Sequence, residues 1–217
     1  MSILHEDAAG KYLGRKLCVS ATFHEVECRN RLAAGWASFH KHKAELCCKH
    51  YSLSDRVRLF EAVITPVVLH GCSSWTLTSS LERGLKTTWR RMLRFVFGIH
   101  RRRNISNSDS EETWVDYVRR AAHAIEAKAV ALGMEGWHHM YRRRKWRFAG
   151  RVVRQTGNRW STRAVHWVPC NGHGRRPGRP FIRWSDDIAN YAGGNWADVA
   201  ADTEWWAVLE EGFGKRL

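Results

Sequence analysis

The 217-residue sequence has no apolar run that approaches the 18 or more residues of a membrane-spanning helix. Its first ten residues include His5, Glu6 and Asp7, whereas a secretory signal peptide begins with basic and then apolar residues. Both absences argue against insertion in a membrane and against export. We therefore expect an intracellular protein, nuclear or cytoplasmic, with no membrane partner.

The six cysteines form no Cys-x-x-Cys pair and match no disulfide framework, so reduced thiols are expected. His166, Cys170 and His173 have zinc-like spacing, but three ligands are fewer than a structural zinc site uses. A glycine-rich phosphate loop after a strand is also missing. We predict that the chain binds no metal and no other cofactor.

Candidate catalytic residues are scarce. Asp186 and Asp187 could bind a divalent ion, but adjacent carboxylates at the start of a helix more often interact with the helix dipole. His138 and His139 have no companion at a spacing typical of an active site. We predict no catalytic residue, and no enzyme activity for the chain by itself.

Acidic residues are absent from one long stretch. Residues 136 to 185 contain no Asp or Glu but thirteen Arg or Lys, whereas residues 186 to 217 contain seven acidic and two basic residues. The whole chain has a formal net charge of +15 and a pI near 10.1. Such a charge is typical of proteins that bind nucleic acid or another anionic surface.

Apolar periodicity predicts a mainly α-helical protein with a short N-terminal strand at about 11–17. Helices are predicted at about 22–46, 52–71 with a kink at Pro66, 81–97, 111–132 and 137–155, with one or two short helices near the C-terminus. We divide the chain into a strand region (1–20), a three-helix bundle (21–100), a linker (101–112) and a basic helical module with an acidic C-terminal segment (113–217).

Basic side chains gather on one face of two predicted helices, at 81–97 and 137–155. Natural surfaces usually mix acids among bases, so these faces favour contacts with phosphates over a merely solvated surface. An arm of Gly, Pro and Arg follows at 172–184, and its "RRPGRP" resembles an AT-hook, with Pro177 where the first central arginine would be. A flexible connector is the equal alternative for the arm.

The predicted nucleic-acid-binding residues are the basic side chains of these two helices and of the arm. They are Arg90, Arg91, Arg94, Arg142, Arg143, Arg144, Lys145, Arg147, Arg151, Arg154, Arg175, Arg176, Arg179 and Arg183.

Seven ordered segments carry a family resemblance. The chain resembles the C-terminal part of LINE-type non-LTR retrotransposon reverse transcriptases in the ordered segments "KYLGRKL", "RNRLAAGWASFHKHKAEL", "SLSDRVRLFEAVITPVVLHGCSSWTLT", "ERGLKTTWRRMLRFVFGI", "RRRKWRFAGRVVRQ", "GRRPGRPFIRWSDDI" and "WADVAADTEWWAVLEEGF". The resemblance spans Lys11 to the C-terminus. It implies that residues 1–20 are the edge of a palm, that 21–100 form the thumb that holds a template–primer duplex, and that the later basic region is a post-thumb extension.

The family's metal-binding motif is missing. An aromatic-Ala-Asp-Asp stretch should precede the Tyr-Leu-Gly at 12–14, and no such stretch is present. Polymerisation with two metal ions needs these carboxylates. The family's Cys-Cys-His-Cys knuckle and an endonuclease motif are missing too. The resemblance therefore implies a nucleic-acid-binding fragment of an RNA-directed DNA polymerase, whose partners are RNA, an RNA/DNA duplex or the palm domain of a reverse transcriptase.

Two alternatives stay open. In the first, the chain is a non-catalytic structural or interaction remnant, and the basic 136–185 stretch pairs with the acidic 186–217 tail or with a missing palm domain. In the second, Asp186 and Asp187 belong to a nuclease.

Overall fold

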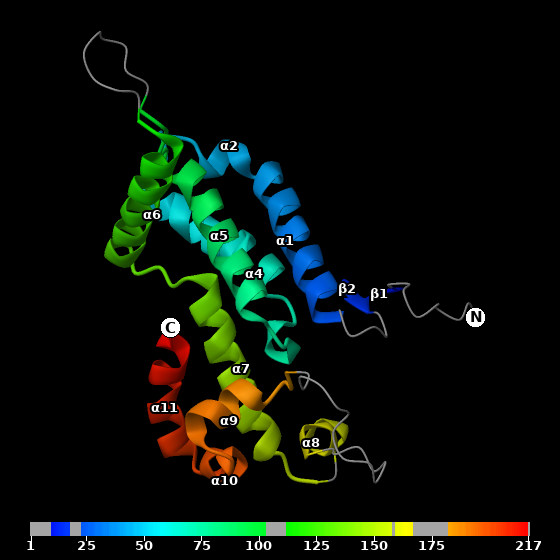
Figure 1. The fold of residues 1–217 in the computed structure, drawn as a ribbon. Coiled ribbons are helices and arrows are strands. Elements are labelled where there is room, and N and C mark those ends of the chain that lie inside the picture. The colour runs from blue at the N-terminus through cyan, green and yellow to red at the C-terminus, as the bar shows by residue number, and fades with distance from the viewer. Residues whose placement is uncertain (1–9, 18–22, 103–111, 158, 167–181, 217) are drawn as a thin grey trace. The chain divides into compact units, whose positions relative to one another are not determined.

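A computed structural model describes residues 10–17, 23–102, 112–157, 159–166 and 182–216 (Figure 1). These residues are mainly α-helical, as predicted. The predicted N-terminal strand is a hairpin of two antiparallel strands, β1 (Gly10–Tyr12) and β2 (Arg15–Leu17). Leu13 and Gly14 join the strands with φ values of 46° and 80°. Positive φ at both positions of a two-residue loop matches the twist of a hairpin, which explains the reversal.

The described chain divides into two compact units. Unit 1 comprises residues 1–70 and 79–138, and unit 2 comprises residues 71–78 and 139–217. The predicted linker at 101–112 lies inside unit 1, between α5 (Ser79–Val96) and α6 (Trp114–Ala131), and its residues 103–111 lie outside the described part. Helices α5 and α6 contact each other, and α6 buries Tyr117 and Ile125. The change of composition at 101–112 therefore marks a loop within one unit and not a boundary between two.

Unit 1 also contains α1 (Phe23–Lys41), α2 (Lys43–Leu46), α3 (Leu53–Val63) and α4 (Thr65–Val68). The predicted kink at Pro66 is confirmed as the break between α3 and α4, because proline cannot donate the backbone hydrogen bond of a continuous helix. Helix α1 contacts α4 closely at Gly35. A Cβ atom there would lie 2.4 Å from Val68 Cγ2, so only glycine allows this approach.

Unit 2 contains the 3-10 turn η1 (Cys72–Ser74) and most of α7 (Trp137–Val153). It continues through α8 (Trp160–His166), α9 (Asp186–Ala192), α10 (Trp196–Ala201) and α11 (Thr203–Lys215). Its core joins α7 to the three C-terminal helices through Trp146, Ile188, Trp196, Trp206 and Phe213. The acidic segment is therefore part of the hydrophobic core of unit 2.

Two tryptophans form the centre of that core. The rings of Trp146 and Trp206 are stacked with centroids 3.7 Å apart. Each indole N–H donates to the backbone carbonyl of the other residue, at 2.9 Å and 3.1 Å. Stacking and satisfied polar groups together make this pair a specific join between α7 and α11, because a buried indole N–H without a partner would cost free energy.

Candidate nucleic-acid interface

The structure divides the predicted basic residues between the two units. Arg90, Arg91 and Arg94 lie on α5 in unit 1. Those from 142 to 154, together with Arg183, lie in unit 2. Arg175, Arg176 and Arg179 lie outside the described residues, and with them the AT-hook-like arm.

Lys145 is buried in unit 2. Its side chain is 1% exposed, and Nζ donates to Asp187 Oδ2 at 2.8 Å. The ammonium also lies 5.4 Å from the ring of Trp184. A buried charge needs such partners to offset the loss of hydration. Because its charge is used inside the unit, Lys145 presents no ammonium at the surface.

Two more basic side chains, one on α7 and one directly after it, also bind the C-terminal segment. Arg147 forms an ion pair with Glu210 of α11 at 2.7 Å, and Arg154 donates to the Ala200 carbonyl at 2.5 Å. Arg144 and Arg151 are exposed on the same helix. These contacts agree with the alternative in which the chain is a structural remnant and the basic 136–185 stretch pairs with the acidic 186–217 tail.

Asp186 and Asp187 both have structural roles. Asp187 pairs with Lys145, and an Oδ2 of Asp186 accepts a hydrogen bond from the backbone N–H of Arg183 at 2.7 Å. Among the residues that the structure describes, no group of three or more His, Cys, Asp or Glu is arranged to hold a metal ion. None of the described helices is both long enough and apolar enough to cross a membrane.

Arg90 binds α6 rather than solvent. It donates to Glu126, and Lys86 lies 3.9 Å from the same carboxylate. Burial alone would raise the pKa of Glu126, but the hydrogen bond and charge of Arg90 outweigh it and lower that pKa. Arg90 thus fixes α6 against α5.

Arg91 and Arg94 lie beside aromatic rings. The Arg91 guanidinium lies 5.5 Å from the ring of Trp36, and that of Arg94 lies 5.7 Å from the ring of Phe95. Lys43 is 5.9 Å from the ring of Phe95. Such distances are within the range of a cation–π interaction. Neither arginine forms an ion pair with a described carboxylate, and the same holds for Lys43.

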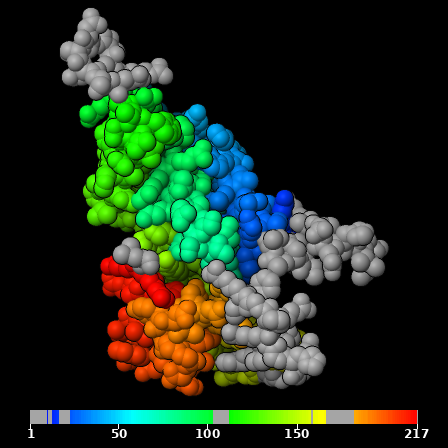
Figure 2. Space-filling model, in the orientation of Figure 1, coloured from blue at the N-terminus to red at the C-terminus, as the bar shows by residue number. Residues whose placement is uncertain are grey.

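We call this surface the aromatic–basic patch, and it consists of Trp36, His40, Lys43, Arg91, Arg94 and Phe95. It lies where α1, the start of α2 and α5 meet in unit 1. Figure 2 shows the surface of the N-terminal helices in blue beside the green surface of the later helices of this unit. The sequence showed the arginines but not the rings, because Trp36 fits the apolar stripe of its helix. The available signal was the i,i+4 spacing of Trp36 with His40 and of Arg91 with Phe95.

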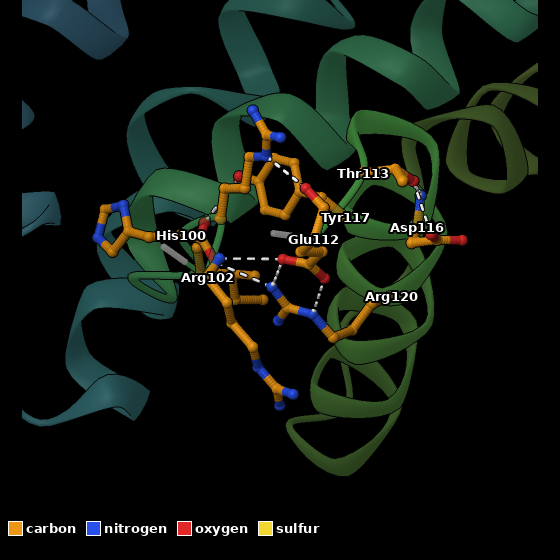
Figure 3. A network of polar contacts seen from close by, with 9 residues as sticks. His100, Arg102, Glu112, Thr113, Asp116, Tyr117 and Arg120 are labelled. Carbon is orange, nitrogen blue, oxygen red and sulfur yellow. Dashed lines mark hydrogen bonds and ion pairs between the residues drawn. The ribbon is translucent and has the colours of Figure 1, made fainter. Parts of the chain in front are cut away.

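A polar network secures the start of α6 (Figure 3). Glu112 accepts from Arg120 Nε at 2.7 Å and from the Arg102 backbone N–H at 2.9 Å. The Thr113 hydroxyl caps the helix by accepting from the Asp116 N–H at 3.2 Å. The hydrogen bonds from Arg120 and then from Arg102 lower the pKa of Glu112 to about 2. The carboxylate therefore keeps its charge, and its hold on the chain before α6, down to acidic pH.

One curated relative is similar to this chain over most of its length. The two are 26% identical over 211 residues, which cover 91% of this chain and 68% of the relative, a protein of Caenorhabditis elegans described as transposon-derived and uncharacterized. The similarity points to shared ancestry with a transposon-derived protein. No known protein family matches the chain. No solved structure matches it at a significant level either.

Proposed function

We propose that this protein is a nucleic-acid-binding piece of a transposon-derived reverse transcriptase, equivalent to its thumb and post-thumb region. In this role it grips RNA or an RNA/DNA template–primer duplex and performs no synthesis itself. The proposal combines the sequence resemblance with the similarity to a transposon-derived relative. The proposed role is binding alone, because the given sequence has no aromatic-Ala-Asp-Asp stretch to hold the metal ions of a polymerase.

The observation that carries the proposal is the positive surface of α5 and its surroundings. Arg91 and Lys43 are exposed, Arg94 is half-buried, and each lies near an aromatic ring instead of a described carboxylate. Arginine side chains that keep their hydrogen-bond donors unused can bind phosphates with two parallel hydrogen bonds. We therefore place the main contact in unit 1 and leave Lys145 out of it.

The test is filter binding of a labelled RNA/DNA hybrid to the full chain. The double variant R91Q/R94Q removes two positive charges, and we expect it to bind at least about tenfold more weakly at physiological salt. R58Q is the matched control, because Arg58 also lies in unit 1 but is 3.7 Å from Asp55. If the wild-type chain does not bind the hybrid, or if R58Q weakens binding as much as the double variant, the proposal is wrong.

A second candidate role applies to unit 2. Lys145 with Asp187 and Arg147 with Glu210 favour a structural use of its basic helix, in which positive charge holds the C-terminal segment. The exposed Arg151 distinguishes the two roles. If unit 2 binds nucleic acid, R151Q lowers affinity for the hybrid; if its charges only stabilise the fold, R151Q leaves affinity unchanged.

A further inference from the structure

The aromatic rings of the patch pack against one another and leave part of the Phe95 ring exposed. Trp36 and Phe95 come from α1 and α5, and their ring centroids are 6.5 Å apart with the planes at 82°. His40 stacks on Trp36 at 5.7 Å with an interplanar angle of 28°. A large indole, an imidazole and a phenyl ring thus meet at one place on the surface of unit 1.

Packing alone does not account for the exposed ring. Phe95 is 39% exposed, whereas Phe39 on α1 and Trp89 on α5 are 1% and 5% exposed. The helices therefore have a buried face for their other large rings. Phe95 lies at the edge of this face, with its ring centroid 6.1 Å from that of Phe39 and the cationic groups of Lys43 and Arg94 within 6 Å of the ring.

Aromatic rings bordered by cations that pair with no described carboxylate suit one class of ligand. Each base of a nucleic acid has an aromatic face that stacks on such rings, and each nucleotide brings a phosphate that arginine or lysine can neutralise. In a duplex the faces of the bases are covered by their neighbours in the stack. Only unpaired bases, in a single strand, a loop or an end, can lie on a protein ring.

We propose that the aromatic–basic patch binds single-stranded RNA or DNA by stacking unpaired bases on Phe95 and on the Trp36–His40 pair, while Arg91, Arg94 and Lys43 contact the phosphates. The inference rests on the proposed nucleic-acid binding and names its substrate more closely. A single-stranded template beside the duplex is the form of nucleic acid that such a patch would hold. Sequence preference is weak, because every base offers a stacking face.

The test compares three labelled probes of equal phosphate number: a single-stranded RNA, an RNA/DNA hybrid of half its length and an abasic single strand of its full length. We expect F95L to weaken binding of the single strand by roughly tenfold, as the loss of one stacked base would, and to leave binding of the hybrid nearly unchanged. The abasic strand has no base for either Phe95 or the Trp36–His40 pair, so it should bind the wild-type chain more weakly than the single-stranded RNA binds F95L. W114L is the matched control, because Trp114 is 59% exposed on α6 of the same unit.

The outcomes separate this inference from the proposed function. If neither the hybrid nor the single strand binds the wild-type chain, both fail. If the hybrid binds but F95L and W114L bind the single-stranded RNA equally well, or if the abasic strand binds as tightly as the RNA, only the stacking inference fails. A poly-glutamate chain of equal charge that competes as well as the RNA, with the same dependence on Phe95, would assign the patch to an acidic protein partner instead. Circular dichroism of F95L, compared with the wild type, confirms that the variant is folded.

Discussion

At the scale of single residues, a buried carboxylate ties the hairpin to α1. Glu27 is 0% exposed and accepts from Arg31 Nε at 3.0 Å and from the backbone N–H of Lys16 at 2.6 Å. Arg31 in turn donates to the Gly14 carbonyl in the hairpin loop. In the sequence, Glu27 and Arg31 are four residues apart, which is the spacing of a common ion pair on a helix surface. The spacing does not indicate that this pair is buried.

The substitution E27Q should destabilise the protein by about 3 kcal/mol, because it leaves the charge of the buried Arg31 without its partner. The measurement is urea unfolding followed by circular dichroism. E25Q is the control, since Glu25 forms an exposed pair with Arg29 on the same helix, and it should cost about 0.5 kcal/mol or less. Equal losses for the two variants would show that Glu27 has no special role.

Glu112 predicts a dependence of stability on pH. Hydrogen bonds lower its pKa in the folded chain to about 2 from the ordinary value of 4.5, so the folded state binds fewer protons than the unfolded state. Its contribution to stability is therefore complete above about pH 4.5 and is lost as the pH falls towards about 2.

We expect the melting temperature of the wild type to fall more steeply between pH 5 and pH 3 than that of E112Q. E45Q removes an exposed carboxylate of α2 and should follow the wild type. If E112Q and the wild type lose stability in parallel, the network in Figure 3 does not hold the charge as described.

At the scale of elements, periodicity in the sequence identified the helices but not their partners. The predicted helix start at 52 and the predicted kink at Pro66 are both confirmed, by the N-cap Ser52 of α3 and by the break before α4. The stacking of Trp146 on Trp206 joins residues 60 positions apart, and no local pattern encodes such a pair. The division of α5's arginines between Glu126 and the aromatic rings also depends on which helices become neighbours.

The close contact of α7 with α11 predicts an asymmetry between two glycines. A Cβ atom on Gly150 would lie 2.5 Å from the indole nitrogen of Trp206, so G150A should cost about 1 to 3 kcal/mol through overpacking. Gly84 of α5 has nothing within 4 Å of such an atom, and G84A should be neutral or stabilise by up to about 1 kcal/mol. Thermal unfolding of both variants measures the difference. A G150A protein as stable as the wild type would contradict the described packing.

At the scale of the whole molecule, the chain shows a basic stretch and an acidic tail that fold together in unit 2. The opposite charges of the two segments are visible in the sequence, and they supported two opposed hypotheses. In one the basic side chains are free to bind phosphates, and in the other they pair with the acidic tail. For α7 the pairing of Arg147 and Lys145 favours the second, whereas Arg91 and Arg94 of unit 1 keep the first open. Charge counts alone could not show that basic side chains pair with acids in unit 2 and lie beside rings in unit 1, because the fold decides which residues become neighbours.

Removal of residues 186–217 tests the role of the tail. The deletion takes Ile188, Trp196, Trp206 and Phe213 from the core of unit 2, so we expect residues 139–166 to lose their protection from proteolysis. A tail that only masked a basic face would leave these residues protected and would raise the affinity for RNA. Limited proteolysis, with the fragments identified by mass spectrometry, separates the two results.

The central claim is that Arg91 and Arg94 of unit 1 grip a polyanion. Its most direct test is the salt dependence of RNA/DNA binding. For the wild type, the logarithm of the association constant should fall linearly with the logarithm of salt concentration. Each lost phosphate contact should reduce the slope by about 0.7 to 0.9, so the slope of R91Q/R94Q should be shallower by about 1.5. The slope of R58Q should match that of the wild type. A wild-type chain without a salt slope, or a double variant with the full slope, would contradict the account.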